Sequence, residues 1–240
     1  MIIYRNTIEL NGQSSTEIKG LLIQSLPPIT KPMIRTTVEE IDGRDGDIVT
    51  ELGYAAYDKQ ITIGLYGDFD IDDVIEYFNS QGVVTFSNEP DKYYYYQIIN
   101  QIDFERLIRF RTATVTFHVQ PFKFSTTEVE KSFDPVETSA ITIRNNGNYY
   151  SRPTITLSGE GTVNLSLNGQ QIFVIYFDEN LDHLTIDTTA MEAYIDTTDN
   201  LANRYVDGNY DNFRLNVGAN TISWSGTLNQ IAINNYSRWI

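Results

Sequence analysis

Alternation of apolar and polar residues is the feature that most constrains how this chain can fold. Residues 111–119 place Ala113, Val115, Phe117 and Val119 on one side and threonines and a histidine on the other. Residues 59–66 repeat the pattern with Ile61, Ile63 and Leu65. Successive side chains of a strand point to opposite faces, so both segments predict half-buried strands. Hydrophobic residues make up 41% of the chain, enough for a real core, and the sequence predicts a mainly β protein.

A single helical pattern interrupts the strands of the N-terminal half. Ile71, Val74, Ile75 and Phe78 recur at i, i+3, i+4 and i+7, which is the spacing of one apolar helix face. Asp70 or Asp72 can cap its start, and Gly82 can end it. We therefore expect an N-terminal β-sheet domain with one packed helix.

The C-terminal half carries only strand and turn signals. Asn168-Gly169 lies between two alternating runs and predicts a type I′ hairpin, because both of its positions need positive φ. Short strands at this spacing, without a helical pattern, predict a β-sandwich. The further strands are expected around residues 142–144, 154–157, 184–186, 192–195, 213–217, 221–224 and 230–233.

The two halves meet at a polar stretch bounded by proline. Pro121 ends one strand, the chain then becomes polar, and Asp134-Pro135 forms another break. We expect a first domain at residues 1–125, a linker at 126–136 and a second domain at 137–240.

The charge balance argues against nucleic-acid recognition. The chain has 17 basic and 32 acidic residues, a net charge of −15, and the excess is shared by both halves. An acidic surface repels phosphate, so we expect no specific nucleic-acid binding. The start lacks the pattern of a signal peptide, and no apolar run approaches the roughly 18 residues of a membrane helix, so we expect no membrane association.

Catalytic, metal and cofactor chemistry has weak support. There is no cysteine, and the two histidines, His118 and His183, lie in different halves. Asp187-Thr188-Thr189 and Asp196-Thr197-Thr198 lack the glycine of an aspartic-protease motif. Residues 42–47 have glycines at the wrong positions for an EF-hand and are interpreted as an acidic turn. We expect no enzyme activity, no metal and no cofactor.

Aromatic residues are the candidates for binding. In the run Tyr93–Tyr96, strand geometry places Tyr94 and Tyr96 on one face and Tyr93 and Tyr95 on the other, so half should be core. Tyr93, Tyr95 and Trp239 are candidates for an interface or for stacking on a saccharide. Trp224 alternates with Ile222 and is expected in the core.

An ordered set of short stretches resembles the distal tail protein family of siphophages. No stretch is specific alone, but the set spans nearly the whole chain in family order. In the first half these are residues 42–46, 52–54, 60–63, 71–79 and 120–124, and in the second half residues 146–148, 151–155, 157–161, 184–187 and 215–222.

This resemblance implies a structural function. Family members have an N-terminal domain that forms a hexameric ring capping the tail tube, and a galectin-like or carbohydrate-module-like β-sandwich that projects from it. The implied partners are further copies of the chain, the major tail protein and the tail-associated protein, with a receptor-binding protein or a saccharide as further candidates. The implied location is the tail tip of the virion, after synthesis in the cytoplasm of the bacterial host. Neither half has a long insertion, so the chain resembles the compact form.

Two points stay open at the level of sequence. A lectin-like module that binds host cell-surface saccharide through the C-terminal sandwich is the alternative to a tail hub, since such sandwiches also serve as scaffolds. If a ring forms, its channel must let DNA pass, and acidic groups would not retain a duplex. Asp42, Asp45 and Asp47 are the candidate acids of that channel.

Overall fold

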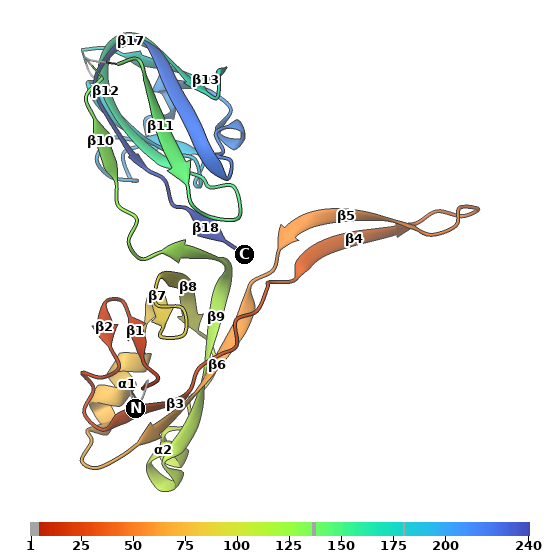
Figure 1. Ribbon diagram of the computed structural model, residues 1–240, viewed down its shortest axis with the longest axis vertical. Coiled ribbons are helices and arrows are strands. Elements are labelled where there is room, and N and C mark those ends of the chain that lie inside the picture. Colours follow the sequence, from red (N-terminus) through yellow and green to blue (C-terminus); the bar gives the residue numbers. More distant parts are fainter. Residues whose placement is uncertain (1–4, 136–137, 180) are drawn as a thin grey trace. The chain divides into compact units, whose positions relative to one another are not determined.

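The computed structural model describes residues 5–135, 138–179 and 181–240. The fold is mainly β, which confirms the expected class. The chain divides into two compact units, Met1–Thr126 together with Ile240 (unit 1) and Thr127–Trp239 (unit 2) (Figure 1).

Unit 1 is built on an antiparallel sheet with the strand order β2-β1-β7-β8-β9-β6-β3. The alternating runs predicted from the sequence form its centre, where Ile61 and Ile63 of β6 and Val115 and Phe117 of β9 are buried. The strands are β1 (Ile8–Leu10), β2 (Gln13–Ser14), β3 (Leu21–Ser25), β6 (Tyr57–Leu65), β7 (Gln81–Phe86), β8 (Lys92–Ile98) and β9 (Thr112–Ser125). A separate two-stranded hairpin consists of β4 (Ile34–Glu40) and β5 (Asp47–Tyr54).

The expected helix is α1 (Ile71–Phe78), and Asp70 caps it by accepting a hydrogen bond from the Asp72 N–H at 2.9 Å. The described part of unit 1 holds a second helix, α2 (Phe104–Phe110), so the expectation of one packed helix was wrong. Phe104, Leu107 and Ile108 of α2 recur at i, i+3 and i+4, but the helix has only 7 residues, which is too short for the repeat to stand out in the sequence. The cap at Asp103, which accepts from the Arg106 N–H at 2.8 Å, was the signal available.

Unit 2 is a curled antiparallel sheet around its own core. Its path runs β10-β17-β12-β13-β16, with β11 also on β17 and β14 joining β12 to β15. The strands of this sheet are β10 (Lys131–Phe133), β11 (Ala140–Asn145), β12 (Thr154–Leu167), β13 (Gln170–Phe177), β14 (His183–Asp187), β15 (Glu192–Tyr194), β16 (Val206–Gly208) and β17 (Gly218–Asn234). The unit also holds the short strand β18 (Arg238–Trp239), which is not part of this sheet, and the 3-10 turns η1 (Asn203–Tyr205) and η2 (Tyr210–Asn212).

The long strands β12 and β17 each unite two of the short strands expected from the sequence. Their pairing shifts register around Gly159, and Gly226 has a φ of +97°. A Cβ on Gly226 would lie 2.3 Å from the carbonyl oxygen of Thr162, so the close approach of the two strands here requires glycine.

The predicted type I′ hairpin is confirmed, since Asn168 and Gly169 have φ values of 51° and 84° between β12 and β13. Trp224 is in the core, as expected. The strand expected at residues 213–217 is wrong. Phe213 and Leu215 are buried there, but the segment pairs only through an isolated bridge between Ser151 and Leu215.

The segment expected to be a linker, residues 126–136, lies mostly in unit 2. Its residues 131–133 form β10, which pairs with β17. The Glu128 carboxylate accepts hydrogen bonds from the Ser237 N–H at 2.5 Å, the Ser237 hydroxyl at 2.7 Å and the Asn235 amide at 3.0 Å. Residues 136 and 137, the expected end of the linker and start of the second domain, lie outside the described residues.

Candidate functional site

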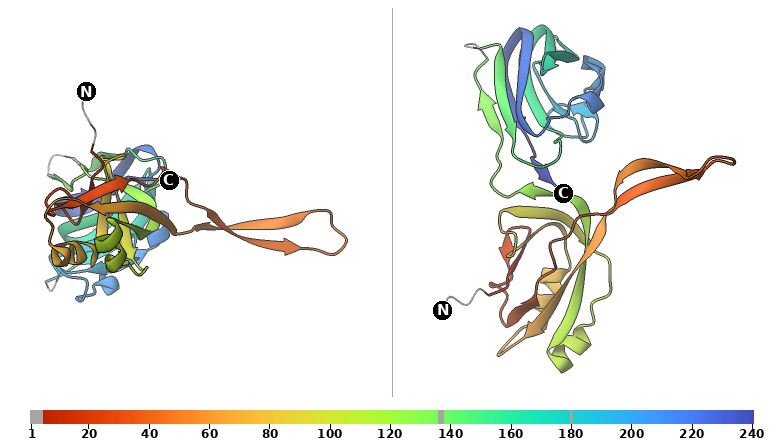
Figure 2. Two further views of the ribbon diagram at one scale, coloured as in Figure 1. Left: turned by 90° about the horizontal axis from the view of Figure 1, so that it is seen from below. Right: turned by 45° about the vertical axis from the view of Figure 1, so that its right-hand side comes forward.

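The β4–β5 hairpin is the most exposed element of unit 1, and we call it the arm. It extends away from the sheet of unit 1 (Figures 1 and 2). Val38 and Val49 face each other across the two strands and are 53% and 55% exposed. Apolar side chains at cross-strand positions normally cover a core, so their exposure marks the arm as a candidate contact surface.

The base of the arm is fastened to unit 1 by two side-chain hydrogen bonds. Lys59 donates to the Pro28 carbonyl at 3.0 Å, and Asn88 donates to the Pro27 carbonyl at 2.9 Å. Both carbonyls belong to the segment between β3 and β4, so one strand of the arm starts from a fixed point. The other strand leads through Ala55 and Ala56 directly into β6.

The candidate acids Asp42, Asp45 and Asp47 lie together at the tip of the arm and are all exposed. Residues 42–46 form the turn, in agreement with the interpretation of an acidic turn. None of the three has an ion-pair partner among the residues that the structure describes. The arm from 34 to 54 holds six acidic and two basic residues, so its net charge is −4.

The candidate tyrosines lie on β8 of unit 1. Tyr94 and Tyr96 are buried and Tyr95 is 43% exposed, so the expected alternation holds. Tyr93 stacks on Phe124 at 5.6 Å, and Tyr95 meets Phe124 edge to face at 5.4 Å. These rings form an aromatic cluster on the outer face of the sheet. The third candidate, Trp239, lies in β18 and is half-buried.

Sequence analysis missed a buried polar network behind that cluster. Lys123 donates to the Glu89 carboxylate at 2.7 Å, and the Tyr94 hydroxyl donates to the same group at 2.9 Å. Lys59 is 3% exposed above the rings of Tyr94 and Tyr57, and burial lowers its pKa to about 8. The signal was present, because Lys59 falls on the same face of its strand as Ile61 and Ile63.

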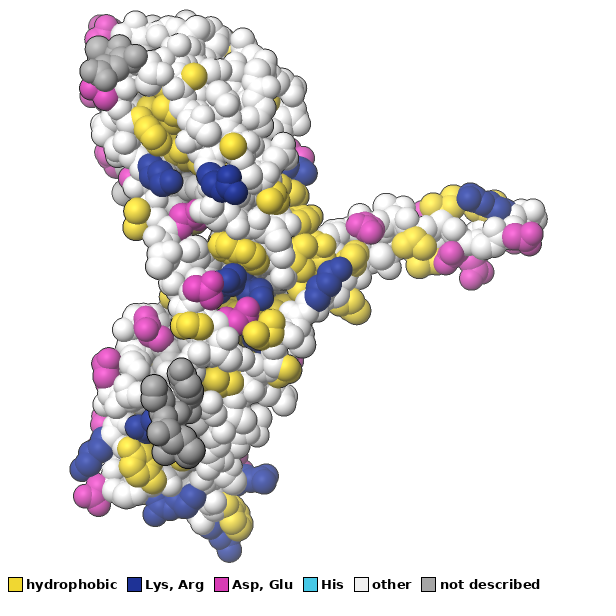
Figure 3. Space-filling view, in the orientation of Figure 1, with side chains coloured by type: hydrophobic (Ala, Val, Ile, Leu, Met, Phe, Trp, Pro, Cys, Tyr) yellow, Lys and Arg dark blue, Asp and Glu magenta, His cyan; other side chains and the backbone are white. Residues whose placement is uncertain are grey.

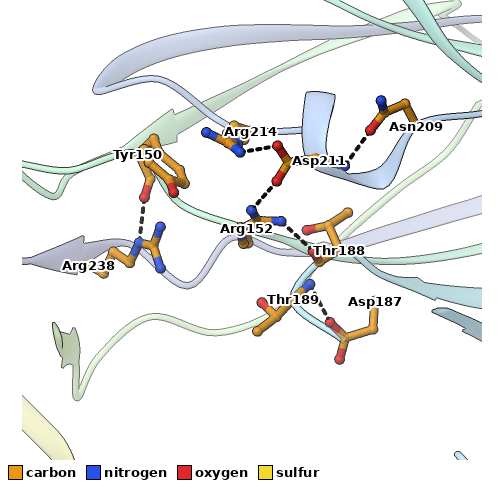
Figure 4. A network of polar contacts seen from close by, with 9 residues as sticks. All are labelled: Tyr150, Arg152, Asp187, Thr188, Thr189, Asn209, Asp211, Arg214 and Arg238. Carbon is orange, nitrogen blue, oxygen red and sulfur yellow. Dashed lines mark hydrogen bonds and ion pairs between the residues drawn. The ribbon is translucent and has the colours of Figure 1, made fainter. Parts of the chain in front are cut away.

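A second network joins distant segments of unit 2 (Figure 4). Asp211 accepts hydrogen bonds from both Arg214 and Arg152, which lower the pKa of its carboxyl to about 2. Arg152 also donates to the Thr188 carbonyl at 2.9 Å, and Arg214 lies over the Tyr150 ring at 4.7 Å. The guanidiniums meet partners within the unit, so this network cross-links segments of unit 2.

The remaining catalytic candidates are not brought together. His118 contacts Asp58 at 2.8 Å in unit 1, whereas His183 contacts Asp182 and Asp196 at 2.6 and 2.9 Å in unit 2. Asp187 accepts from the N–H groups of Thr189 and Ala190, so the first Asp-Thr-Thr stretch forms a turn. In the described ranges no group of three potential ligands could hold a metal ion.

Neither a protein-family model nor a curated protein sequence matches this chain. The fold, by contrast, matches solved structures. The SPP1 Dit protein (gp 19.1), a paradigm of the hub adsorption apparatus in phages that infect Gram-positive bacteria, is similar with a TM-score of 0.67 and 19% identity. That match covers 98% of this chain and 99% of the SPP1 protein. The chain has a Dit-like fold.

A chain of the phage p2 baseplate, in its activated conformation with Sr, shares the Dit-like fold with a TM-score of 0.51 and 11% identity. It covers 95% of this chain and 97% of the baseplate chain. The resemblance proposed from short, ordered stretches is thus confirmed at the level of the fold. Among the described residues, no helix is long and apolar enough to cross a membrane.

Proposed function

We propose that this protein is a structural hub of a phage or prophage tail tip. It would form a hexameric ring that joins the tail tube, made of major tail protein, to the tail-associated and receptor-binding proteins. The likeness to SPP1 Dit carries this proposal, because it spans both units and nearly all of both chains. The two similar structures belong to a hub adsorption apparatus and a baseplate, which supports a structural function and not an enzymatic one.

The arm supports self-association. A two-stranded hairpin is at best marginally stable in water unless another surface covers it. Here β4 and β5 pair only with each other among the described strands, so both outer edges of the arm are open. Exposed valines and open edges are features that a neighbouring copy could cover.

The test is the assembly state of the full-length protein, alone and with major tail protein added. Light scattering should find a mass near six times 27.4 kDa, and electron microscopy should show closed rings. A strict monomer under both conditions would overturn the proposal. If that monomer bound saccharide, the lectin-like alternative would take its place.

The channel of such a ring is the proposed place of the acids at the arm tip. Asp42, Asp45 and Asp47 would present negative charge to a passing duplex, which itself carries about one negative charge per 1.7 Å. Rings with all three changed to Lys should bind duplex DNA tightly and with a steep salt dependence, whereas wild-type rings should not. Tight binding by wild-type rings at physiological salt would refute a channel lined by acids.

A further inference from the structure

We propose that helix α2 of one copy receives the arm of a second copy. This contact rests on the proposed oligomer and names the two surfaces that build it. The arm supplies an apolar pair framed by carboxylates, and α2 supplies apolar side chains framed by arginines.

The donating surface is one face of the arm. The register of β4 and β5 places Glu40, Val38, Val49 and Glu51 on this face, with the two glutamates on either side of the valine pair. Glu40 lies directly opposite Asp47, and like charges at opposed positions destabilise a hairpin. A cation from a partner would relieve this repulsion. Apolar and acidic side chains follow one another along the arm (Figure 3).

The receiving surface is the exposed side of α2. Ile108 is 44% and Phe110 61% exposed, and the Arg109 guanidinium lies over the Phe110 ring at 5.3 Å. Arg106 and Arg109 border an open cleft of about 440 Å³, which is also lined by Phe110, Glu105 and the capping residue Asp103. Neither arginine has an ion-pair partner in the described part of the chain. Aromatic and arginine side chains are enriched in protein interfaces. Lys and Arg side chains gather at the end of unit 1 that holds α2 (Figures 1 and 3).

The two surfaces lie at opposite ends of the same ladder. The arm leads into β6 at Tyr57, which pairs with Val119, whereas α2 leads into β9 at Thr112, which pairs with Gly64. Seven residues of strand separate these ends by roughly 24 Å. One copy therefore presents two different surfaces at two ends. A contact between them is heterologous, and heterologous contacts are the kind that close rings.

The contact uses the face of the arm that also carries Asp47, and it leaves Asp42 and Asp45 at the tip outside it. The inference therefore leaves Asp42 and Asp45 to the proposed channel and assigns Asp47 to the contact.

The experiment reverses charge on each surface of the full-length protein. Arg106→Glu with Arg109→Glu, and separately Glu40→Lys with Glu51→Lys, should weaken association at least about tenfold, because like charges then meet across the contact. Combining all four changes in one chain should restore assembly toward the wild-type level. Lys131→Glu with Arg204→Glu, two exposed residues of unit 2, has the same change in charge as the Arg106→Glu and Arg109→Glu variant and is its control, which should leave assembly unchanged.

The outcomes separate this inference from the proposed function. If the wild type forms rings and both charge-reversed variants form them equally well, the α2 contact is wrong and the hub remains. Weakened variants that the fourfold change does not rescue would also overturn the pairing of these two surfaces. If the wild type itself never assembles, the proposed function fails first.

Discussion

Two hairpins of this chain have similar local structure and opposite surroundings. The β12–β13 hairpin of unit 2 packs one face against the core, and Val163, Leu165, Phe173 and Ile175 are fully buried. The β4–β5 arm of unit 1 pairs over a comparable length, yet its valines are more than half exposed. Backbone pairing alone does not tell the two apart.

The two hairpins differ in whether other residues of the same unit pack over their apolar face. The β12–β13 hairpin packs against residues of its own unit, such as Phe213, which stacks on Phe173 at 5.6 Å. At the base of the arm Tyr54 meets Phe122 edge to face at 5.7 Å, but Val38 and Val49 have no such layer over them and stay more than half exposed. A hairpin that is paired but not covered therefore suggests assembly, whereas one that is covered accounts for the stability of the unit itself.

The largest expected effect on stability comes from a substitution inside the β12–β13 hairpin. Phe173→Ala should lower the free energy of unfolding of unit 2 by about 3–5 kcal/mol, because it removes a fully buried ring and leaves a cavity. Val49→Ala in the arm should change the free energy of unfolding of unit 1 by no more than about 0.5 kcal/mol in the unassembled protein. Denaturant unfolding of both variants checks the comparison, and equal losses would contradict it.

The second prediction concerns where the self-contained unit begins. A fragment of residues 127–239 should be folded and rich in β structure by circular dichroism, since it keeps β10 and the Glu128 hydrogen bonds. A fragment of residues 137–239 lacks both and should be clearly less stable. If the longer fragment is unfolded while the full chain is folded, the two units share more of their stability than the division indicates.

A point substitution tests the same boundary with a smaller effect. Glu128→Ala removes a carboxylate that accepts three hydrogen bonds and should cost about 1.5–3 kcal/mol. Glu130→Ala, at an exposed position two residues further on, is the matched control and should stay within about 0.5 kcal/mol. Thermal unfolding of the full-length variants gives both values.

Sequence patterns predicted those elements whose burial is regular. The alternation in β6 and β9, the Asn168-Gly169 turn and the Asp70 cap each follow from one local rule, and the structure has all three. The sequence did not predict the two strands of the arm, because without a buried face their residues show no alternation. It predicted only the acidic turn at residues 42–47 between them.

The misses share a physical cause, which is tertiary context. The segment 213–217 has apolar alternation but finds no neighbouring strand with which to form a ladder. Lys59 is charged yet buried, because the Pro28 carbonyl and nearby rings stabilise its ammonium group. The candidate acids were named correctly as a turn, but their shared position at the end of a projecting arm depends on the strands on either side of them.

The smallest expected effect is a pH dependence confined to unit 2. Both ring nitrogens of His183 contact carboxylates, Nε2 with Asp196 and Nδ1 with Asp182, and these contacts raise its pKa above the ordinary value of 6.5. The folded state therefore holds this proton more tightly than the unfolded state. The resulting stability is fully present below about pH 6.5 and is lost as the pH rises through the folded-state pKa.

His183→Gln should thus lower the melting temperature more at pH 5.5 than at pH 8.5. The loss should stay below about 1 kcal/mol, because solvent screens this partly exposed cluster. Since all three residues lie in unit 2, the fragment of residues 127–239 should show the same difference as the full chain. A variant that is destabilised equally at both pH values would mean that the imidazole contributes packing and not charge.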